Sequence, residues 1–450
     1  MQELTFKQIA DATGGTCSDF GKVTSVSTDT RTITDGALYI ALKGENFDGH
    51  DFIGKAFENG AAAVLSERPT DLGPCILTES TDKALLSLAA YYRTLFNTTV
   101  VGITGSVGKT TTKEMTACVL ESKYKTLKTI GNLNNQIGLP MTLMRLEKEY
   151  EAAVIEMGMS AAGEISALSK TARPDLAIIT NIGYSHIEFF GTRENILKAK
   201  LEILDGMESG APLIINGDDE LLSKYRDESG RPVVLYGIDN PEVQVRGVNI
   251  SSGEGKTSFE IVYLGKSIKA SIPAQGKHLV YDALSAFAAG ILCNIPPEDC
   301  VKALEAYVPV GMRQHTVEKD GIKILVDCYN ASPTSVEASL TVLSQMKAQG
   351  RKFAVIGDML ELGERSAELH GRIADFAKNL EIDGLLCFGE ESKNIADRAN
   401  SEGKIFARHF ASRGELEEYL RKNIKSGDIV SVKGSRGMRL EEVIKSVWGE

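Results

Sequence analysis

The chain has 450 residues, of which 42% are hydrophobic and 25% are charged, and its net charge is −11 at pH 7. This length favours about three domains, each with its own core, and seven scattered cysteines without metal-ligand spacing indicate reduced thiols in a cytoplasmic protein. The acidic balance argues against nucleic acid or an anionic membrane as a partner, and no stretch resembles an export signal or a membrane span.

Residues 1–97 are predicted to form a compact α/β unit. Apolar runs at 37–42 and 61–65 have the length of strands, and residues 82–96 have the pattern of a helix. Asn97 and Thr98 then lead into the strand that opens the next region.

The central region, residues 98–309, alternates apolar runs with helical stretches. This alternation predicts a mostly parallel sheet with crossover helices. The apolar runs that carry the pattern are residues 152–158, 175–183 and 211–217.

The pattern changes between residues 243 and 273, where short strands are separated by turn residues. Turns expected at Ser252-Gly253 and Leu264-Gly265 predict an antiparallel addition to the sheet. Helices are expected near 278–293 and 297–307.

The C-terminal region, residues 310–450, follows a boundary at Pro309-Val310-Gly311 and repeats the strand–helix alternation. Its apolar runs are residues 322–328, 353–356, 384–388 and 429–432. The pattern indicates a Rossmann-like domain without a G-x-G-x-x-G fingerprint. The chain is therefore predicted to be an α/β protein of three domains, with a central phosphate-loop parallel-sheet domain and a C-terminal Rossmann-like domain.

Residues 101–113 read VGITGSVGKTTTK, an apolar strand followed by a glycine-bearing turn and the start of a helix. Small turn residues let backbone N–H groups surround an anion, and the helix N-terminus favours negative charge. The strict Walker spacing would place glycine where Ile103 stands, so the pattern indicates an ATP site of unusual subtype; a glycine-rich turn without a ligand is the alternative. The residues expected to contact ATP are Gly105, Ser106, Val107, Gly108, Lys109, Thr110 and Thr111.

A magnesium ion needs more oxygen ligands than Thr110 alone supplies. Glu156 ends an apolar run, at the edge where ligands gather in parallel sheets, and is the candidate carboxylate. The alternative is an exposed loop carboxylate.

His186, Lys198 and Lys200 are ambiguous from the residues alone. His186 follows a long apolar strand, and a lone histidine is either structural or a ligand. Lys198 and Lys200 lie two residues apart on a helix, hence on different faces, and solvated lysines are the simplest interpretation. A neutral lysine facing magnesium could instead capture carbon dioxide as a carbamate and supply oxygen ligands.

Many ordered motifs resemble those of the Mur ligase family, nearly from end to end. They are STDTRTITDGALYIALKGENFDGHDFI (27–53), TGSVGKTTTKEM (104–115), GNLNNQIGLPMTL (131–143), EMGMSAAGEI (156–165), TNIGYSHIEFFG (180–191), AKLEI (199–203), DCYNASPTSVEASL (327–340), GDMLELG (357–363) and VKGSRGM (432–438). The resemblance implies a UDP-binding N-terminal domain (1–97), a central ATPase domain (98–309) and a mobile C-terminal ligase domain (310–450).

The resemblance also gives roles to the ambiguous residues. It implies that Thr110 and Glu156 share magnesium, that His186 helps hold a second ion, and that Lys200 rather than Lys198 is carbamylated. Lys109, Glu156, His186 and Lys200 are then the expected catalytic residues.

Substrate contacts follow from two further segments of the resemblance. Asn134 and Asn135 lie in a loop expected to face the muramyl-peptide, although a turn-forming pair is the alternative. The residues expected to seat the UDP group are Ser27, Asp29, Thr30, Arg31, Gly49, His50 and Asp51.

The C-terminal region is expected to approach ATP through Arg313, Asp327 and Asn330. His370 and the cluster Lys433, Ser435 and Arg436 are candidates for binding the second reactant, with surface polar residues as the alternative.

One segment departs from the family pattern. The family commonly has H-N-x-x-N-A where this chain reads HLVYDA (278–283), so Asp282 is the candidate to replace an asparagine at adenine.

Within the family, DCYNASP and GDMLELG resemble the member that adds a D-alanyl-D-alanine dipeptide to a UDP-muramyl-tripeptide. The implied reaction activates the tripeptide carboxylate as an acyl phosphate with ATP and magnesium, in a protein expected to be a monomer. The alternatives are another ATP-dependent amino-acid ligase of the same build, such as a folate-polyglutamate enzyme, and a non-catalytic nucleotide-binding module.

Overall fold

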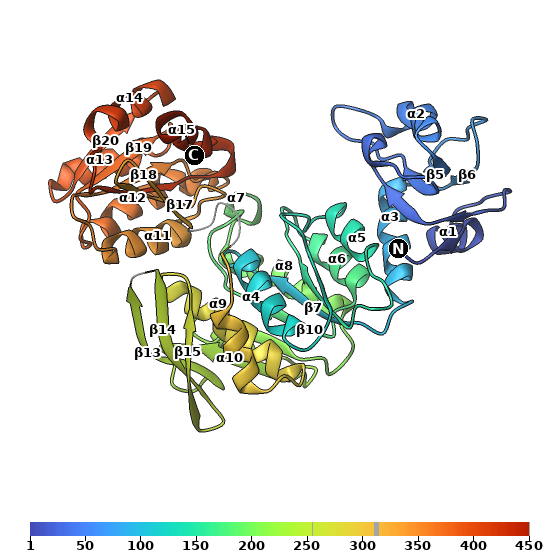
Figure 1. The fold of residues 1–450 in the computed structure, drawn as a ribbon, viewed down its shortest axis with the longest axis horizontal. Helices are drawn as coiled ribbons and strands as arrows, with labels where there is room; N and C mark the ends of the chain where they lie inside the picture. The colour runs from blue at the N-terminus through green and yellow to red at the C-terminus, as the bar shows by residue number, and fades with distance from the viewer. Residues whose placement is uncertain (254, 310–314, 450) are drawn as a thin grey trace.

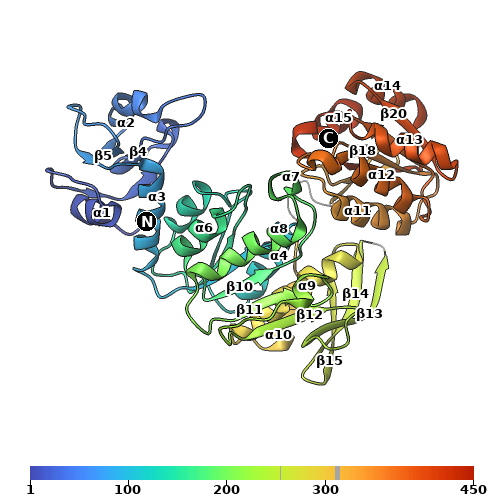
Figure 2. The ribbon, with the colours of Figure 1, turned by 180° about the vertical axis from the view of Figure 1, so that it is seen from behind.

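The chain folds into three α/β units that follow one another along the sequence. The computed structural model describes residues 1–253, 255–309 and 315–449. Figure 1 shows the N-terminal and C-terminal units at opposite ends of the molecule with the central unit between them, and the reverse view in Figure 2 shows the same arrangement. The predicted α/β class with three domains is confirmed.

The N-terminal unit is built on a four-stranded parallel sheet of order β3-β4-β5-β6. Its strands are β1 (Leu4–Thr5), β2 (Lys22–Val23), β3 (Ser25–Ser27), β4 (Ala37–Ile40), β5 (Ala61–Ser66) and β6 (Cys75–Leu77). Its helices are α1 (Phe6–Thr13), α2 (Ile53–Glu58) and α3 (Thr81–Arg93). The predicted helix 82–96 therefore exists but ends at Arg93, whose buried guanidinium donates hydrogen bonds to the carbonyls of Phe96 and Thr98.

The central unit has a nine-stranded sheet of order β15-β14-β13-β12-β11-β10-β7-β9-β8. The parallel strands are β7 (Thr99–Thr104), β8 (Thr126–Lys128), β9 (Ala152–Glu156), β10 (Leu176–Ile179), β11 (Leu213–Asn216) and β12 (Val233–Gly237). The helices are α4 (Lys109–Glu121), α5 (Gly138–Leu143), α6 (Glu164–Ala172), α7 (Ile187–Phe190), α8 (Arg193–Leu201), α9 (Lys277–Leu292) and α10 (Pro297–Glu305). Val100 packs into the core on one face of the sheet and Val101 into the core on the other, which explains the continuous apolar run.

The antiparallel addition is confirmed as β13 (Val245–Gly253), β14 (Lys256–Tyr263) and β15 (Lys266–Ile272). Leu264 and Gly265 form the predicted two-residue turn, both with positive φ. The turn predicted at Ser252-Gly253 is wrong, because both residues pair with β14 and the Ser252 hydroxyl bonds that of Thr257 across the ladder.

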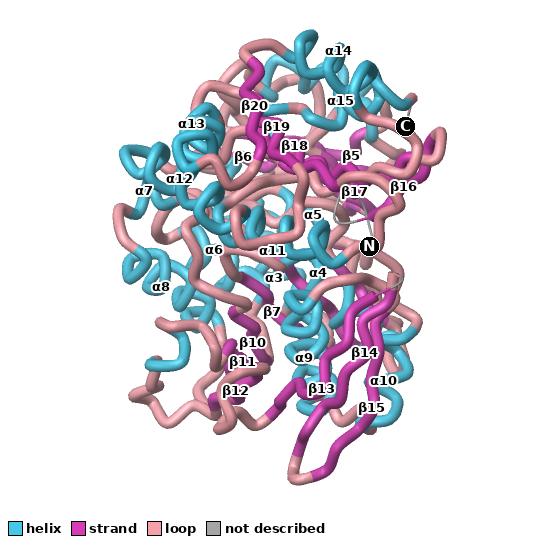
Figure 3. The backbone as a smooth tube through the Cα atoms, turned by 90° about the vertical axis from the view of Figure 1, so that its left-hand side faces the viewer, coloured by secondary structure: helices cyan, strands magenta, loops and turns pink. Residues whose placement is uncertain are grey.

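The C-terminal unit has a six-stranded sheet of order β16-β17-β21-β18-β19-β20, in which only the pairing of β16 with β17 is antiparallel. Its strands are β16 (His315–Lys319), β17 (Ile322–Val326), β18 (Lys352–Gly357), β19 (Gly384–Phe388), β20 (Phe406–Phe410) and β21 (Ile429–Lys433). Its helices are α11 (Pro333–Gln345), α12 (Ser366–Ala377), α13 (Lys393–Glu402), α14 (Arg413–Asn423) and α15 (Leu440–Trp448). Figures 1 and 3 place α11 on the side of this unit that faces the central unit.

The apolar runs predicted at 152–158 and 175–183 are longer than the strands that form. The strands end at Glu156 and Ile179, and the following residues turn over the carboxyl edge of the sheet beside β7. This edge is where parallel sheets gather ligands, and here it carries the phosphate loop. Among the described residues no helix is long and apolar enough to cross a bilayer.

Candidate active site

The loop between β7 and α4 requires glycine at two positions. A Cβ on Gly105 would lie 1.8 Å from Oγ1 of Thr180. Gly108 precedes α4 with φ 87°, and a Cβ there would lie 2.7 Å from Oδ1 of Asp282. The predicted glycine-bearing turn at a helix N-terminus is confirmed, and no larger side chain fits either position without movement.

Thr180 and Asn181, which follow β10, brace this loop. The Thr180 hydroxyl and the Asn181 amide donate to the carbonyl of Val107 at 2.6 and 2.9 Å, and the Asn181 amide oxygen accepts from the Val107 N–H at 3.0 Å. The Gly183 N–H donates to the Ser106 hydroxyl at 2.9 Å. Sequence reasoning missed Thr180 and Asn181; the signal was a polar pair directly after a buried strand.

Glu156 lies at the end of β9 beside the first turn of α4 and is 1% exposed. Its carboxylate accepts from the Thr110 hydroxyl at 2.8 Å and from the Asn134 amide at 2.7 Å. Its own N–H donates to the Thr129 hydroxyl at 3.0 Å. The alternative of an exposed loop carboxylate is wrong, because this buried acid is held directly against the phosphate-loop helix.

The two asparagines of the loop before α5 have different surroundings. Asn134 bonds Glu156, whereas the Asn135 amide oxygen accepts from the N–H groups of Ile137 and Gly138. The Asn135 side-chain oxygen therefore stabilises a turn, as the alternative interpretation expects. Both asparagines line the same cavity.

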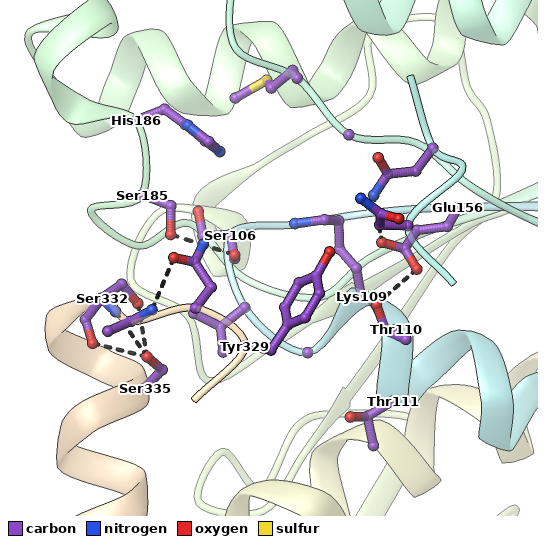
Figure 4. A pocket seen from close by; sticks show the side chains of 18 of the residues that line it. Ser106, Lys109, Thr110, Thr111, Glu156, Ser185, His186, Tyr329, Ser332 and Ser335 are labelled. Atoms are coloured by element: carbon purple, nitrogen blue, oxygen red, sulfur yellow. Dashed lines mark hydrogen bonds between the residues drawn. The ribbon is translucent and has the colours of Figure 1, made fainter. Parts of the chain in front are cut away.

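His186 stands before α7 in a left-handed conformation with φ 64°. Its Nδ1 lies 2.5 Å from Oε2 of Glu361, a residue of the C-terminal unit. The interaction with His186 lowers the pKa of the Glu361 carboxyl. Figure 4 shows the His186 side chain at the wall of the cavity that contains Lys109.

Lys198 and Lys200 lie on different faces of α8, as their spacing predicts. Lys198 is exposed, whereas Lys200 is 2% exposed. Burial, and secondarily the positive charge of Lys109, hold the pKa of Lys200 well below its ordinary value. The solvated interpretation is thus wrong for Lys200, and its surroundings favour a neutral amine.

A cavity of about 650 Å³ lies between the central and C-terminal units and is lined by both. This volume is typical of a small-molecule site. Of the expected site residues it brings together Ser106, Val107, Gly108, Lys109, Thr110, Thr111, Asn134, Asn135, Glu156, His186, Asp327 and Asn330. Gly105 and Lys200 do not line it within the described part of the chain, and Arg313 lies outside the described residues.

Lys433 and Asp327 form a buried ion pair at the C-terminal wall of the cavity. The Lys433 ammonium lies 2.9 Å from the Asp327 carboxylate and also donates to the carbonyl of Asn330. Lys433 thereby fixes the segment that carries both expected nucleotide contacts.

His370 occupies neither of its expected places, at the second reactant or on the surface. It is fully buried, its Nδ1 donates to the Ser366 carbonyl at 2.8 Å, and its Nε2 accepts from the Met359 N–H at 3.0 Å. Burial lowers the pKa of His370. Both nitrogens are used within the fold, so the ring supports the loop after β18.

The residues expected to seat UDP lie at the end of β3 and in the segments after β3 and β4, at the carboxyl edge of the N-terminal sheet. Asp29 holds Arg31 at 2.6 Å, and this hydrogen bond lowers the pKa of Asp29 to about 2. The His50 ring is used internally, between Asp48 at 2.6 Å and the N–H of Glu67 at 3.1 Å. Within the described residues, none of Ser27, Asp29, Thr30, Arg31, Gly49, His50 and Asp51 lines the central cavity.

Asp282, at the departure from the family pattern, packs behind the phosphate loop. It is 7% exposed and accepts from the Thr112 hydroxyl at 2.8 Å. His278 and Asp282 both line the cavity.

Three family descriptions match successive parts of the chain. They are the Mur ligase family catalytic domain at residues 22–93, the Mur ligase middle domain at 103–290, and the Mur ligase glutamate ligase domain at 312–436.

Similar proteins extend over nearly the whole length. UDP-N-acetylmuramoyl-tripeptide–D-alanyl-D-alanine ligases of Bacillus subtilis and Escherichia coli are 40% and 35% identical, each with 99% of both chains covered. A crystal structure of MurF from Acinetobacter baumannii covers 100% of both chains with a TM-score of 0.93 and 30% identity. MurF from Thermotoga maritima in complex with ADP has a TM-score of 0.84 and 32% identity, covering 94% of this chain and 96% of that one.

Proposed function

The chain belongs to the Mur ligase family, and we propose that it joins D-alanyl-D-alanine to UDP-N-acetylmuramoyl-tripeptide while cleaving ATP to ADP and phosphate. The observation that carries this proposal is the cavity in which the phosphate loop, the buried Glu156–Thr110 pair and the segment from Asp327 to Asn330 face one another. Such a cavity brings a nucleotide and a second reactant together between two units. The full-length relatives and the ADP-bound structure support the reaction and the nucleotide.

The donor chemistry at the phosphate loop fits magnesium. A hard cation of this size takes one or two protein carboxylates and completes its shell with water and phosphate oxygens. Thr110 and Glu156 already place a hydroxyl and a carboxylate 2.8 Å apart, although among the described residues no group of three or more His, Cys, Asp and Glu is arranged so that it could hold a metal ion. We therefore assign Thr110, Glu156, His186 and a carbamylated Lys200 to hold two ions, which when bound offset the charge of the reacting anions.

The carbamate at Lys200 is supported by burial. Only a neutral amine attacks carbon dioxide, and the buried Lys200 amine favours that form. The carbamate formed from the neutral amine is an anion near Lys109, so it balances the positive charge of that lysine.

The reaction proceeds by two displacements. Lys109 and the N–H groups at the start of α4 bind the phosphates, and the tripeptide carboxylate attacks the γ-phosphorus, so that a P–O bond forms as the bond to ADP breaks. The neutral amine of D-alanyl-D-alanine then attacks the acyl carbon, so that a C–N bond forms as the C–O bond to phosphate breaks, and the phosphate leaves with the proton that the amine loses. Asp327 and Asn330, on the opposite wall, help exclude water that would hydrolyse the acyl phosphate.

The N-terminal unit is assigned to the UDP group and the muramyl-peptide extends toward Asn134 and Asn135. Arg31 is the residue suited to diphosphate, because its guanidinium is largely exposed beside Asp29. We propose that residues 1–97 bind the UDP-substrate, residues 98–309 bind ATP, and residues 310–450 form the C-terminal ligase domain. Nucleotide-activated substrates and ATP are cytoplasmic metabolites, so we propose a cytoplasmic location, and we propose a monomer.

Phosphate release by the purified full-length protein tests the function. With ATP, magnesium and UDP-muramyl-tripeptide, we expect release that depends on D-alanyl-D-alanine. Release with glutamate but not with the dipeptide would instead identify another amino-acid ligase of this family. Nucleotide binding without release under any combination of acid and amine would identify a non-catalytic module.

The carbamate has its own test. Lys200→Ala should abolish ligation, bicarbonate should not restore it, and the exposed Lys198→Ala should behave like the wild type. After labelling with ¹³C-bicarbonate, the wild type and Lys198→Ala should give a carbamate NMR signal that Lys200→Ala lacks. A ligation rate for Lys200→Ala equal to that of the wild type would refute the assignment.

A further inference from the structure

The central and C-terminal units also meet beside His186, at a contact between residues 184–188 and residues 357–365. The N–H of Glu188 donates to the carbonyl of Glu361 at 3.2 Å. A Cβ on Gly363 would lie 3.3 Å from Cα of Glu188, so the two backbones are closely packed there. The contact therefore includes main chain on both sides, and the close approach of the His186 ring to the Glu361 carboxylate lies at its centre.

Arginine side chains of the C-terminal unit extend this contact over an aromatic ring. The guanidinium groups of Arg365 and Arg372 lie 5.3 and 5.9 Å from the centre of the Tyr184 ring. Each such contact places a positive charge over the electron-rich face of the ring, which is attractive. Arg372 is itself held by Glu337 at 3.0 Å, so its position is fixed within the C-terminal unit.

The loop that presents Glu361 is held firmly by its own unit. Asp358 accepts from the N–H groups of Glu390 and Ser392 at 3.0 and 2.7 Å. The next two N–H groups along the loop donate to His370 and to the Ser435 hydroxyl at 3.0 and 2.9 Å. These hydrogen bonds therefore fix the position of the loop that carries Glu361.

The backbone conformations of two residues in this contact are a second, independent observation that supports a specific interaction. Glu361 and His186 both adopt left-handed conformations, with φ of 63° and 64°. Such conformations strain a non-glycine residue and persist where the surrounding structure holds them in place. Here both strained residues belong to the same contact, one from each unit.

We propose that Glu361 is a positioning residue for His186, supplied to the central unit's metal site by the C-terminal unit; this rests on the proposed metal role of His186. The negative charge of the Glu361 carboxylate, 2.5 Å from Nδ1, favours the imidazole proton on that nitrogen and leaves the lone pair on Nε2. A carboxylate commonly lies beside the second ring nitrogen of a histidine that binds a metal, where it fixes the tautomer and the orientation of the ring. Docking of the C-terminal unit thus orients the imidazole for the second ion.

Binding of Mn²⁺ as a probe ion, measured by electron paramagnetic resonance with ADP present, tests the inference in the full-length protein. Loss of such a supporting partner typically costs about 10–100-fold in metal affinity. We expect Glu361→Gln and Glu361→Ala to lower the affinity for one of the two Mn²⁺ ions by about tenfold or more. The exposed Glu381→Gln, in the same unit, is the matched control and should bind as the wild type does.

Hydrogen exchange separates orientation from docking. Glu361→Gln keeps the size of the side chain, so residues 184–190 should remain as protected as in the wild type while Mn²⁺ affinity falls. Wild-type Mn²⁺ affinity in both Glu361 variants, with His186→Asn still losing one ion, would overturn the inference and leave the metal role of His186 intact. Wild-type affinity in His186→Asn as well would overturn that metal role.

Discussion

Gly105→Ala tests whether the phosphate loop depends on the close approach of Thr180. The added Cβ would lie 1.8 Å from Oγ1 of Thr180 and 3.0 Å from its Cβ. Thr180 must therefore move, and its 2.6 Å hydrogen bond to the Val107 carbonyl breaks. Overpacking of this kind costs about 1–3 kcal/mol, and the lost hydrogen bond adds about 1 kcal/mol.

The clash and the lost hydrogen bond together cost about 2–4 kcal/mol beyond the backbone strain of an alanine at φ 152°, and this part alone predicts a fall of roughly 5–15 °C in the thermal midpoint of a domain of this size. Differential scanning calorimetry of the nucleotide-free protein measures it, and isothermal titration with ADP should show weaker binding because the loop N–H groups are displaced. Thr180→Ala alone should lower the free energy of unfolding by only about 1 kcal/mol. The double variant Gly105→Ala/Thr180→Ala should be more stable than Gly105→Ala, because it lacks Oγ1 of Thr180, the atom closest to the added Cβ.

Gly210→Ala is the matched control, since Gly210 has φ 85° and open space around its Cβ position. It measures the cost of a left-handed alanine, about 1–2 kcal/mol, without a clash. A midpoint for Gly105→Ala no lower than that of Gly210→Ala, or a double variant whose loss equals the sum of its parts, would refute the steric explanation.

Two further predictions concern stability in the C-terminal unit. Because burial lowers the pKa of His370, the unfolded chain binds its proton more readily, so the stability from the neutral ring is present above about pH 6.5 and is lost as the pH falls toward the lowered pKa. The thermal midpoint should therefore fall less steeply between about pH 7 and 5 in His370→Gln than in the wild type, and equal slopes would contradict this. Lys433→Met removes the buried partner of Asp327 and should lower stability by about 3–5 kcal/mol, part of which Lys433→Met/Asp327→Asn should recover; an equal loss in both variants would contradict the pairing.

The strands at the centre of each sheet are predictable from sequence because both of their faces are buried. β7, β9 and β10 read as continuous apolar runs, which only a fully covered parallel strand allows. The edge strands β16 and β20 were not predicted, since β16 reads HTVEK with one apolar residue and β20 reads FARHF, and neither is a continuous apolar run. Such short runs also occur in loops, and pairing with a neighbour is what makes them strands.

The parts of the candidate site that depend on local sequence were predictable, whereas those that depend on distant contacts were not. The phosphate loop lies in one continuous segment, so Lys109, Thr110 and the loop glycines could be predicted from their spacing. His50 and His370 resemble ligands in sequence, yet backbone N–H groups of Glu67 and Met359 use their ring nitrogens. Nearly every residue carries a backbone N–H, so no sequence pattern shows that these two N–H groups already bond the histidine ring nitrogens.

The position of each partner also predicts which functions can be separated. The bracing of the phosphate loop by Thr180, Asn181 and Gly183 lies entirely within the central unit. The partner of His186 comes from the C-terminal unit instead. Under the proposed function, nucleotide phosphates therefore need only the central unit, whereas the proposed second metal position and the wall proposed to exclude water draw on both units. Because an acyl phosphate hydrolyses in an open site, the proposed reaction ties activation of the carboxylate to the presence of the C-terminal unit.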